Sequence, residues 1–237
     1  TYDSAQESWL ARYQHETVAL AFAITEEAVE DNLYDSVSQR LTKALARSMA
    51  HTKQVKAASI LNNAFSTSYP GGDGKPLLTT DHPTVDGGEF ANEPSAATDL
   101  SETSLESMWI ALSAYVDERG IPIAVQPRKL IIPPQLVFVA HRLLNTELRV
   151  GTDLNDTNAI RNMGIFPDGY CVNHRLTDTD AWFVKTDVPD GLKHFVRRPL
   201  RTAMEGDFET GNMRYKADER YSFGWTNPRG LWGSPGA

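Results

Sequence analysis

The last third of the chain constrains the fold most, because short apolar runs alternate there with the Asp, Pro and Gly residues that favour turns. From Gly169 onward this pattern predicts a β-rich region that closes on an aromatic, glycine-rich tail. We expect a hairpin with strands at 181–186 and 192–197, joined around 188–191, and a final strand at about 213–224. No residues in this region have the spacing of an active site, so we expect it to build a surface for assembly.

A long amphipathic helix is predicted from about residue 34 to residue 65. Apolar residues recur there mostly every three or four positions, which places them on one stripe of a helix. The stripe comprises Leu33, Val37, Leu41, Leu45, Met49, Val55 and Leu61. A strand at 17–24 precedes it, and Thr25 is the predicted N-cap after that strand.

The middle of the chain predicts irregular structure followed by shorter elements. Residues 66–100 are rich in Gly, Pro and Asp and predict a long loop, a kind of segment that is often functional. The elements expected after it are a helix at about 102–119 between a Ser101 cap and Gly120, a strand at 129–132, a helix from Pro133-Pro134 to about 148, and a polar loop at 151–158. Strands and helices do not alternate regularly, which favours an α+β fold.

Composition places the chain among ordinary globular proteins. It has 237 residues, of which 41% are hydrophobic and 23% charged. No apolar run reaches the roughly 18 residues of a membrane span, and no secretory leader is visible. The net charge of −8 argues against dedicated DNA binding, although it does not exclude a shell that encloses DNA. The single cysteine, Cys171, lies in an apolar run, so we expect a small buried side chain and a reducing place of synthesis.

Catalytic and metal-binding patterns are weak. The six histidines form no H-x-x-x-H or H-E-x-x-H pair, and no G-x-S-x-G or phosphate-loop sequence occurs. Asp81 and His82 are the best candidates for metal or acid–base chemistry, with His174 as a third member. The alternative is that Asp81 and His82 organise a turn before Pro83, and we favour this alternative. We therefore expect no enzyme, cofactor or metal.

Six residues are the candidates for contacts between subunits: Arg197, Arg198, Arg201, Trp225, Arg229 and Trp232. The arginines at 197–201 favour pairing with acidic groups of a neighbouring protein, with nucleic acid as the alternative. The terminal tryptophans lie among Gly and Pro, where they either fold back on the chain or are held by a neighbour.

Five segments in order carry a family resemblance: residues 18–35, 73–83, 128–160, 176–184 and 207–237. Together they resemble major capsid proteins of tailed bacteriophages, most closely the Mu-like major head subunit group. The resemblance covers most of residues 14–237 and implies the Hong Kong 97-type fold, with a peripheral domain, a long spine helix and an axial domain.

The resemblance implies three segments in the chain. Residues 1–99 would hold part of the peripheral domain with the spine helix, residues 100–202 the axial domain, and residues 203–237 the return strand and tail. Family members usually carry an N-terminal arm and an extended loop before the first strand, whereas residues 1–16 precede it here.

The implied function is a major head protein that assembles through pentamers and hexamers into an icosahedral shell. The shell would enclose the DNA genome without sequence-specific binding, and portal, scaffold or decoration proteins are possible partners. The protein would be made in the cytoplasm of a host bacterium and would reside in the virion, not in a membrane. The alternatives left open are an encapsulin-like compartment, a metal-dependent hydrolase built on Asp81 and His82, and a phage tail or decoration protein.

Overall fold

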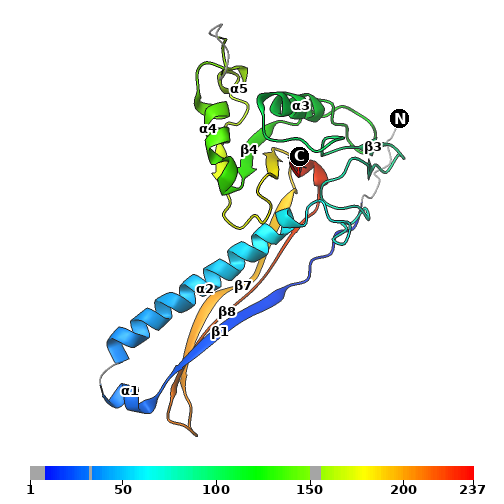
Figure 1. Ribbon diagram of the computed structural model, residues 1–237. Coiled ribbons are helices and arrows are strands. Elements are labelled where there is room, and N and C mark those ends of the chain that lie inside the picture. The colour runs from blue at the N-terminus through cyan, green and yellow to red at the C-terminus, as the bar shows by residue number, and fades with distance from the viewer. Residues whose placement is uncertain (1–8, 32–33, 150–155) are drawn as a thin grey trace. The chain divides into compact units, whose positions relative to one another are not determined.

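A computed structural model describes residues 9–31, 34–149 and 156–237 (Figure 1). The chain forms two compact units, each discontinuous in sequence. Unit 1 comprises residues 1–12, 58–193 and 225–237, and unit 2 comprises residues 13–57 and 194–224. The three segments expected from the family resemblance refer to capsid domains and stay a prediction.

The described helices, 3₁₀ turns (η) and strands follow one another in this order: β1 (Glu16–Ile24), α1 (Glu26–Glu30), α2 (Tyr34–Asn62), β2 (His82–Pro83), β3 (Glu89–Phe90), α3 (Glu102–Ser113), β4 (Pro127–Ile132), η1 (Pro134–Leu136), α4 (Val137–Asn145), α5 (Ala159–Asn162), β5 (Tyr170–Val172), β6 (Trp182–Thr186), β7 (Leu192–Gly206), β8 (Met213–Trp225), η2 (Pro228–Gly230) and β9 (Leu231–Ser234). None of the helices in the described parts of the chain is long and apolar enough to cross a bilayer.

Unit 1 is built around a four-stranded sheet with the order β5-β4-β6-β9. β4 pairs with β5 in parallel and with β6 antiparallel, and β6 pairs antiparallel with β9. β6 is a central strand, and its apolar run is explained by burial on both faces, because successive side chains of a strand point to opposite sides.

Both faces of this sheet are covered. On one face, Trp182 and Val184 of β6 join the buried side of α3, which is formed by Leu105, Met108 and Leu112. On the other face, Phe183 packs in a second cluster with Leu61 at the end of α2, with Leu77 and Leu78, and with Leu231 of β9. Unit 1 is therefore a three-layer structure with its own apolar core.

Unit 2 contains a three-stranded sheet with the order β1-β8-β7 (Figure 1). β1 pairs antiparallel with β8 from Glu16 opposite Tyr221 to Ile24 opposite Met213. The stripe of α2 covers one face of this sheet, where the buried residues Leu45, Met49 and Ala217 pack together. Val55 on the same helix is exposed, so the apolar stripe is only partly buried.

The N-cap predictions are confirmed. The Thr25 hydroxyl accepts a hydrogen bond from the Ala28 amide at 3.4 Å, and Ser101 forms a capping box with Ser104. The long helix is confirmed over Tyr34–Asn62 and ends three residues before the predicted position. The helix predicted at 102–119 ends earlier, at Ser113, because Tyr115 and Val116 turn to meet the segment around Pro122.

The predicted hairpin at 181–197 is wrong. β6 and β7 are strands, but they do not form a hairpin: β6 pairs with β4 and β9, and β7 lies beside β8. The connecting turn instead pairs with the end of the chain, where the amides of Thr226 and Asn227 donate to the carbonyls of Gly191 and Asp190. Gly191 also faces Gly230 so closely that a Cβ at Gly230 would collide with the backbone of Gly191.

The segment at 66–100 is irregular, as predicted, but it is packed rather than loose. It contributes Leu77, Leu78, Phe90 and Leu100 to the buried residues and contains the short β2–β3 pair. Cys171 is exposed, so the prediction of a buried thiol is wrong. It lies in β5, an edge strand whose only partner among the described strands is β4.

Candidate functional site

The predicted Asp81–His82 pair is divided between two sets of partners. His82 is 0% exposed, and its Nδ1 lies 2.6 Å from Oδ2 of Asp73. Asp81 instead pairs with the ammonium group of Lys75 and accepts a hydrogen bond from the Thr79 hydroxyl at 2.6 Å. The hydrogen bond from Lys75 holds the pKa of Asp81 below its usual range.

Asp81 and His82 are therefore held in separate pairs, which fits the interpretation of a turn before Pro83. The imidazole of His82 stacks on Phe90 with the ring centroids 4.9 Å apart, and the side chain is fully buried. His174, the third member of the predicted constellation, is exposed. In the residues that the structure describes, no group of three or more His, Cys, Asp or Glu side chains is placed to hold a metal ion.

Arg229 lies inside unit 1, with 5% of its surface exposed. Its Nη1 lies 2.7 Å from Oε1 of Glu118, and its guanidinium group lies 4.0 Å from the centre of the Phe90 ring. Asn92 extends the same polar cluster by donating to the carbonyl oxygens of Leu77 and Pro228. The side chain of Arg229 therefore fastens the C-terminal segment to the 66–100 segment, and a subunit contact there stays a prediction.

The two terminal tryptophans fold back on their own chain. Trp232 is 2% exposed and packs against Trp182, with ring centroids 5.0 Å apart. Trp225 is half-buried and covers Gly71, where a Cβ atom would collide with the indole ring. Of the two alternatives for these tryptophans, the structure shows the folded-back one; whether a neighbour also contacts Trp225 stays a prediction.

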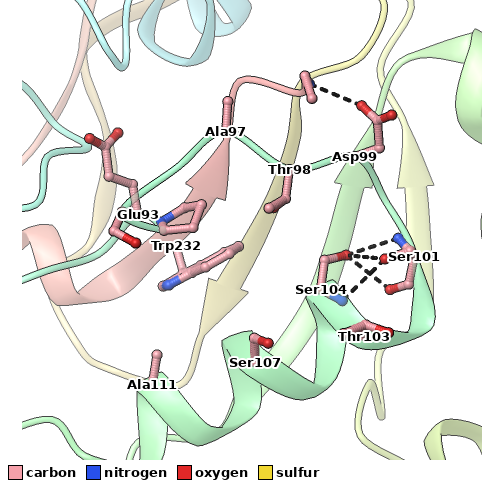
Figure 2. A pocket seen from close by; sticks show the side chains of 13 residues that line it. Glu93, Ala97, Thr98, Asp99, Ser101, Thr103, Ser104, Ser107, Ala111 and Trp232 are labelled. Atoms are coloured by element: carbon pink, nitrogen blue, oxygen red, sulfur yellow. Dashed lines mark hydrogen bonds between the residues drawn. The ribbon is translucent and has the colours of Figure 1, made fainter.

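Figure 2 shows a hollow of about 550 Å³ in unit 1, between the first turns of α3 and the segment at 93–99. Trp232 and Ala237 also line it. The serine hydroxyls are used for capping: the Ser104 amide donates to Oγ of Ser101 at 3.2 Å, and the Ser101 amide donates to Oγ of Ser104 at 2.8 Å. The Ala237 amide donates to Oδ1 of Asp99 at 3.0 Å.

The hollow lacks the groups that would activate a hydroxyl. No histidine, cysteine, lysine or arginine is among the described residues that line it. Its titratable groups are Glu93 and Asp99, and burial raises the pKa of Glu93. A nucleophile needs a base within hydrogen-bond reach that is itself oriented by a third group, and this arrangement is not present among these residues.

Two arginines of the basic cluster in β7, Arg198 and Arg201, form ion pairs with Asp218 of the same chain. Asp218 of β8 is 2% exposed; one of its oxygens lies 2.5 Å from Nη2 of Arg198, and both accept from Nε of Arg201 at 2.8 and 3.0 Å. The hydrogen bond from Arg201 lowers the pKa of the Asp218 carboxyl. Arg197 is exposed, and Arg201 keeps 59% of its side chain exposed.

On the other face of β8, Lys53 of α2 lies 2.7 Å from Oε2 of Glu219 and 5.0 Å from the centre of the Tyr221 ring. The alternation of charged and apolar residues along β8 is the sequence signal for two faces with different neighbours. The predicted candidates omitted Phe208, which lies in the turn between β7 and β8 and is fully exposed at 102%.

Comparison with known proteins places the chain in a family. It belongs to the phage capsid protein family, whose sequence model matches residues 10–233. A search of curated protein sequences found no match. Since the family match covers nearly the whole chain, it defines a shell-forming structural protein and not an enzyme.

Solved structures share the fold at low sequence identity. The capsid of Myoviridae phage XM1 is 9% identical over 95% of this chain and 74% of that chain, with a TM-score of 0.55. The holo-SrpI encapsulin complex from Synechococcus elongatus PCC 7942 is 9% identical over 94% and 72%, with a TM-score of 0.52. A virus-like particle from Pyrococcus furiosus is 12% identical over 92% and 76%, with a TM-score of 0.50.

These structures confirm the predicted α+β fold of the Hong Kong 97 type. Because phage capsids and encapsulins both appear among them, the fold alone does not separate a virus head from a cellular compartment.

Proposed function

We propose that this chain is the major head protein of a tailed bacteriophage, and that its copies self-assemble through pentamers and hexamers into an icosahedral shell around the DNA genome. The observation that carries the proposal is the phage capsid family match over residues 10–233. Five sequence segments that resemble Mu-like major head subunits support the finer assignment.

The surface chemistry supports repeated self-association. Rings of identical copies need heterologous contacts, in which one patch of a subunit meets a different patch of the next. Each contact can be weak, because every subunit makes many at once. Arg197 and Arg201 keep exposed guanidinium groups suited to such contacts, whereas substitutions at the buried Arg229 and Trp232 would act on assembly through the fold of unit 1.

The charge suits a container for DNA. With a net charge of −8, the protein as a whole repels phosphate, so the genome would be enclosed without tight or sequence-specific binding to the wall. The protein would be made in the bacterial cytoplasm and reside in the virion. Portal, scaffold and decoration proteins are the further partners that this role would bring.

An encapsulin-like compartment is the second candidate, and the fold shared with the SrpI encapsulin favours it. The two candidates differ in content, since a phage head holds nucleic acid and a compartment holds protein cargo. Particles purified from the native source, treated with nuclease and then opened, would distinguish them: protected DNA supports the phage head, and a stoichiometric cargo protein supports the compartment.

Electron microscopy of the purified chain tests self-assembly itself. Closed shells, or rings of five and six copies, support the proposal. A monodisperse monomer over a wide range of protein concentration would contradict it, and tubes would favour the tail-protein alternative.

A further inference from the structure

One end of unit 2 is strongly acidic. It combines α1 with the turn between β7 and β8, and Figure 1 shows both at the same end of the three-stranded sheet. The two segments touch, because a Cβ atom at Gly211 would collide with the carboxylate of Glu26. The carboxylates here are Glu26, Glu27, Glu30, Asp31, Glu205, Asp207 and Glu209. Asp207 pairs with Arg214. We call this end, together with Phe208, the acidic tip.

The acidic tip presents Phe208 on an ordered turn. The amide of Asp207 donates to the carbonyl of Asn212 at 2.8 Å, and the amide of Gly211 donates to the carbonyl of Asp207 at 2.9 Å. The Thr210 hydroxyl donates to Oδ2 of Asp207 at 2.7 Å. Gly211 has a φ of 68°, which glycine adopts without strain. These bonds fix the backbone of the turn. A partner that covers the exposed Phe208 ring therefore has little backbone entropy to remove.

A basic surface lies farther along the same sheet. Lys216, Asp218 and Arg220 alternate along β8 and therefore point to one face, opposite to the face that α2 covers. Arg198 and Arg201 converge on Asp218 from β7 and neutralise it. Lys216 and Arg220 are exposed. Besides the hydrogen bond from Arg201, the charge of Lys216 helps to lower the pKa of the neighbouring Asp218. We call this surface, formed by Arg198, Arg201, Lys216 and Arg220, the basic face.

A flat strip of small side chains borders the basic face. In the β1–β8 register, Thr17 lies opposite Arg220, Ala19 opposite Asp218 and Ala21 opposite Lys216, so these residues share the face. All three small residues are exposed. An aromatic ring can lie flat on such a strip while the neighbouring guanidinium groups contact its face or the flanking carboxylates.

Phe208 cannot reach the Ala19–Ala21 strip of its own chain, because Ala19 lies opposite Asp218. Asp218 and Asn212 are six positions apart along β8 and its turn, which corresponds to roughly 20 Å of extended strand. Phe208 and the strip are both fixed by the pairing of β1, β7 and β8, so this ring can cover the strip only of another copy.

We propose that the acidic tip of one copy docks on the basic face of a second copy, with Phe208 as the central anchor on the Ala19–Ala21 strip. The inference rests on the proposed self-assembly and names the pair of surfaces that would meet. The contact is head-to-tail, since each copy offers a tip and a face that differ, and it continues from copy to copy into a ring or network.

Charge reversal on each side tests the pairing. The variant K216E/R220E reverses the basic face, and E27K/E209K reverses the acidic tip; all four side chains are exposed. Each double variant should need a subunit concentration at least about tenfold higher than wild type to form particles at physiological salt, because like charges would then meet. The four-substitution variant should recover assembly, since opposite charges face each other again.

Matched variants separate docking from folding and from general charge effects. E106K/K185E reverses two exposed charges of unit 1 and should assemble like wild type. F208A should weaken assembly, whereas F138A, which removes another exposed phenylalanine, should not. Thermal melting of the unassembled subunit at low concentration should be unchanged for each variant, and K216Q/R220Q provides a milder form of the basic-face change.

The outcomes are distinct. Wild-type assembly by both double variants, or no recovery in the four-substitution variant with its fold intact, would overturn the pairing while leaving the capsid assignment in place. Normal particles of K216E/R220E that have lost their nucleic acid would overturn it in favour of a nucleic-acid surface. If the wild-type chain never assembles, both the proposed function and the proposed docking are contradicted.

Discussion

The sheets of the two units differ in how far their faces are buried. Unit 1 buries a mixed sheet between two apolar clusters, so its central strand β6 has Trp182, Phe183 and Val184 almost without exposure. Unit 2 covers one face of its sheet with α2 and leaves the other face in water, where charged side chains gather. Unit 1 is therefore stabilised mainly by its apolar core, whereas one face of the sheet in unit 2 is exposed and could contact a partner.

The cores differ accordingly. The buried cluster of unit 2 consists of Leu45, Met49 and Ala217, with Val18 and Phe22 packed against it. Ion pairs across its sheet and helix, such as Lys53 with Glu219, supplement this small core. Ion pairs that water can reach contribute little stability, so we expect unit 2 to open at a lower free energy than unit 1.

The largest effect is expected from W182A in unit 1. Removing this fully buried indole should destabilise the protein by about 3–5 kcal/mol, through lost apolar contacts and the cavity that remains. Denaturant unfolding of the unassembled subunit measures the change. F138A, at a side chain that is 78% exposed, is the control and should stay within about 0.5 kcal/mol of wild type. Equal losses in the two variants would contradict the three-layer core.

M49A should have a smaller effect that is confined to unit 2. We expect the free energy of unfolding to fall by about 2–3 kcal/mol, which is at the low end for a buried methionine. The loss is small because a helix on a single sheet face can move into the space left behind. Hydrogen exchange should accelerate in β1 and β8 and stay slow in β4 and β6. Uniform acceleration in all four strands would show that the two units unfold as one.

D218N should destabilise unit 2 less than M49A. The substitution removes the charge that holds Arg198 and Arg201, but both guanidinium groups are partly exposed and can return to water. Exchange should accelerate in β7 and β8. Unchanged exchange in these strands would mean that the arginine pairs add nothing to the fold, and would leave those arginines free for contacts with a partner.

The smallest effect is a difference in pH dependence. The pKa of Asp218 is lowered by its hydrogen bond from Arg201, below the ordinary value of about 3.9. Its contribution to stability is therefore present above that value and is lost as the pH falls through the lowered pKa. The denaturant concentration at the unfolding midpoint, measured as the pH is lowered from 5 to 2, should fall more steeply for wild type than for D218N. Parallel curves would contradict the assignment.

Asp81 and Asp117 in unit 1 also have lowered pKa values, through the Lys75 hydrogen bond and through backbone hydrogen bonds with Ile121 as the largest contributor. D218N therefore keeps part of the acid sensitivity. Only the difference between the two curves reports on unit 2.

Local sequence signals predicted local structure well. The apolar stripe predicted α2, the residues after Ile24 and Leu100 predicted the caps at Thr25 and Ser101, and the apolar runs between turn residues predicted β8. Each signal depends on residues a few positions apart, whose relative geometry the helix or strand itself dictates. Five ordered segments also predicted the family fold, which the comparisons confirm.

Strand pairing could not be predicted in the same way. The turn residues between β6 and β7 suggested a hairpin, yet β6 pairs with β9 from the end of the chain. Burial decides this outcome: Trp182, Phe183 and Val184 need apolar layers on both faces, and β9 completes the sheet between those layers. The same long-range packing buries Arg229 and Trp232, which the sequence had offered as candidates for contacts between subunits.

The sequence by itself determined the helices, their caps, the strands with clear alternation and the family of the chain, because short-range periodicity and ordered motifs carry that information. Only the tertiary structure decided which strands are neighbours, which charges neutralise each other and which remain exposed. The physical reason is that burial and ion pairing depend on residues far apart in the chain. Asp218 meets Arg201 across a sheet, whereas Lys216 and Arg220 on the same strand are left exposed.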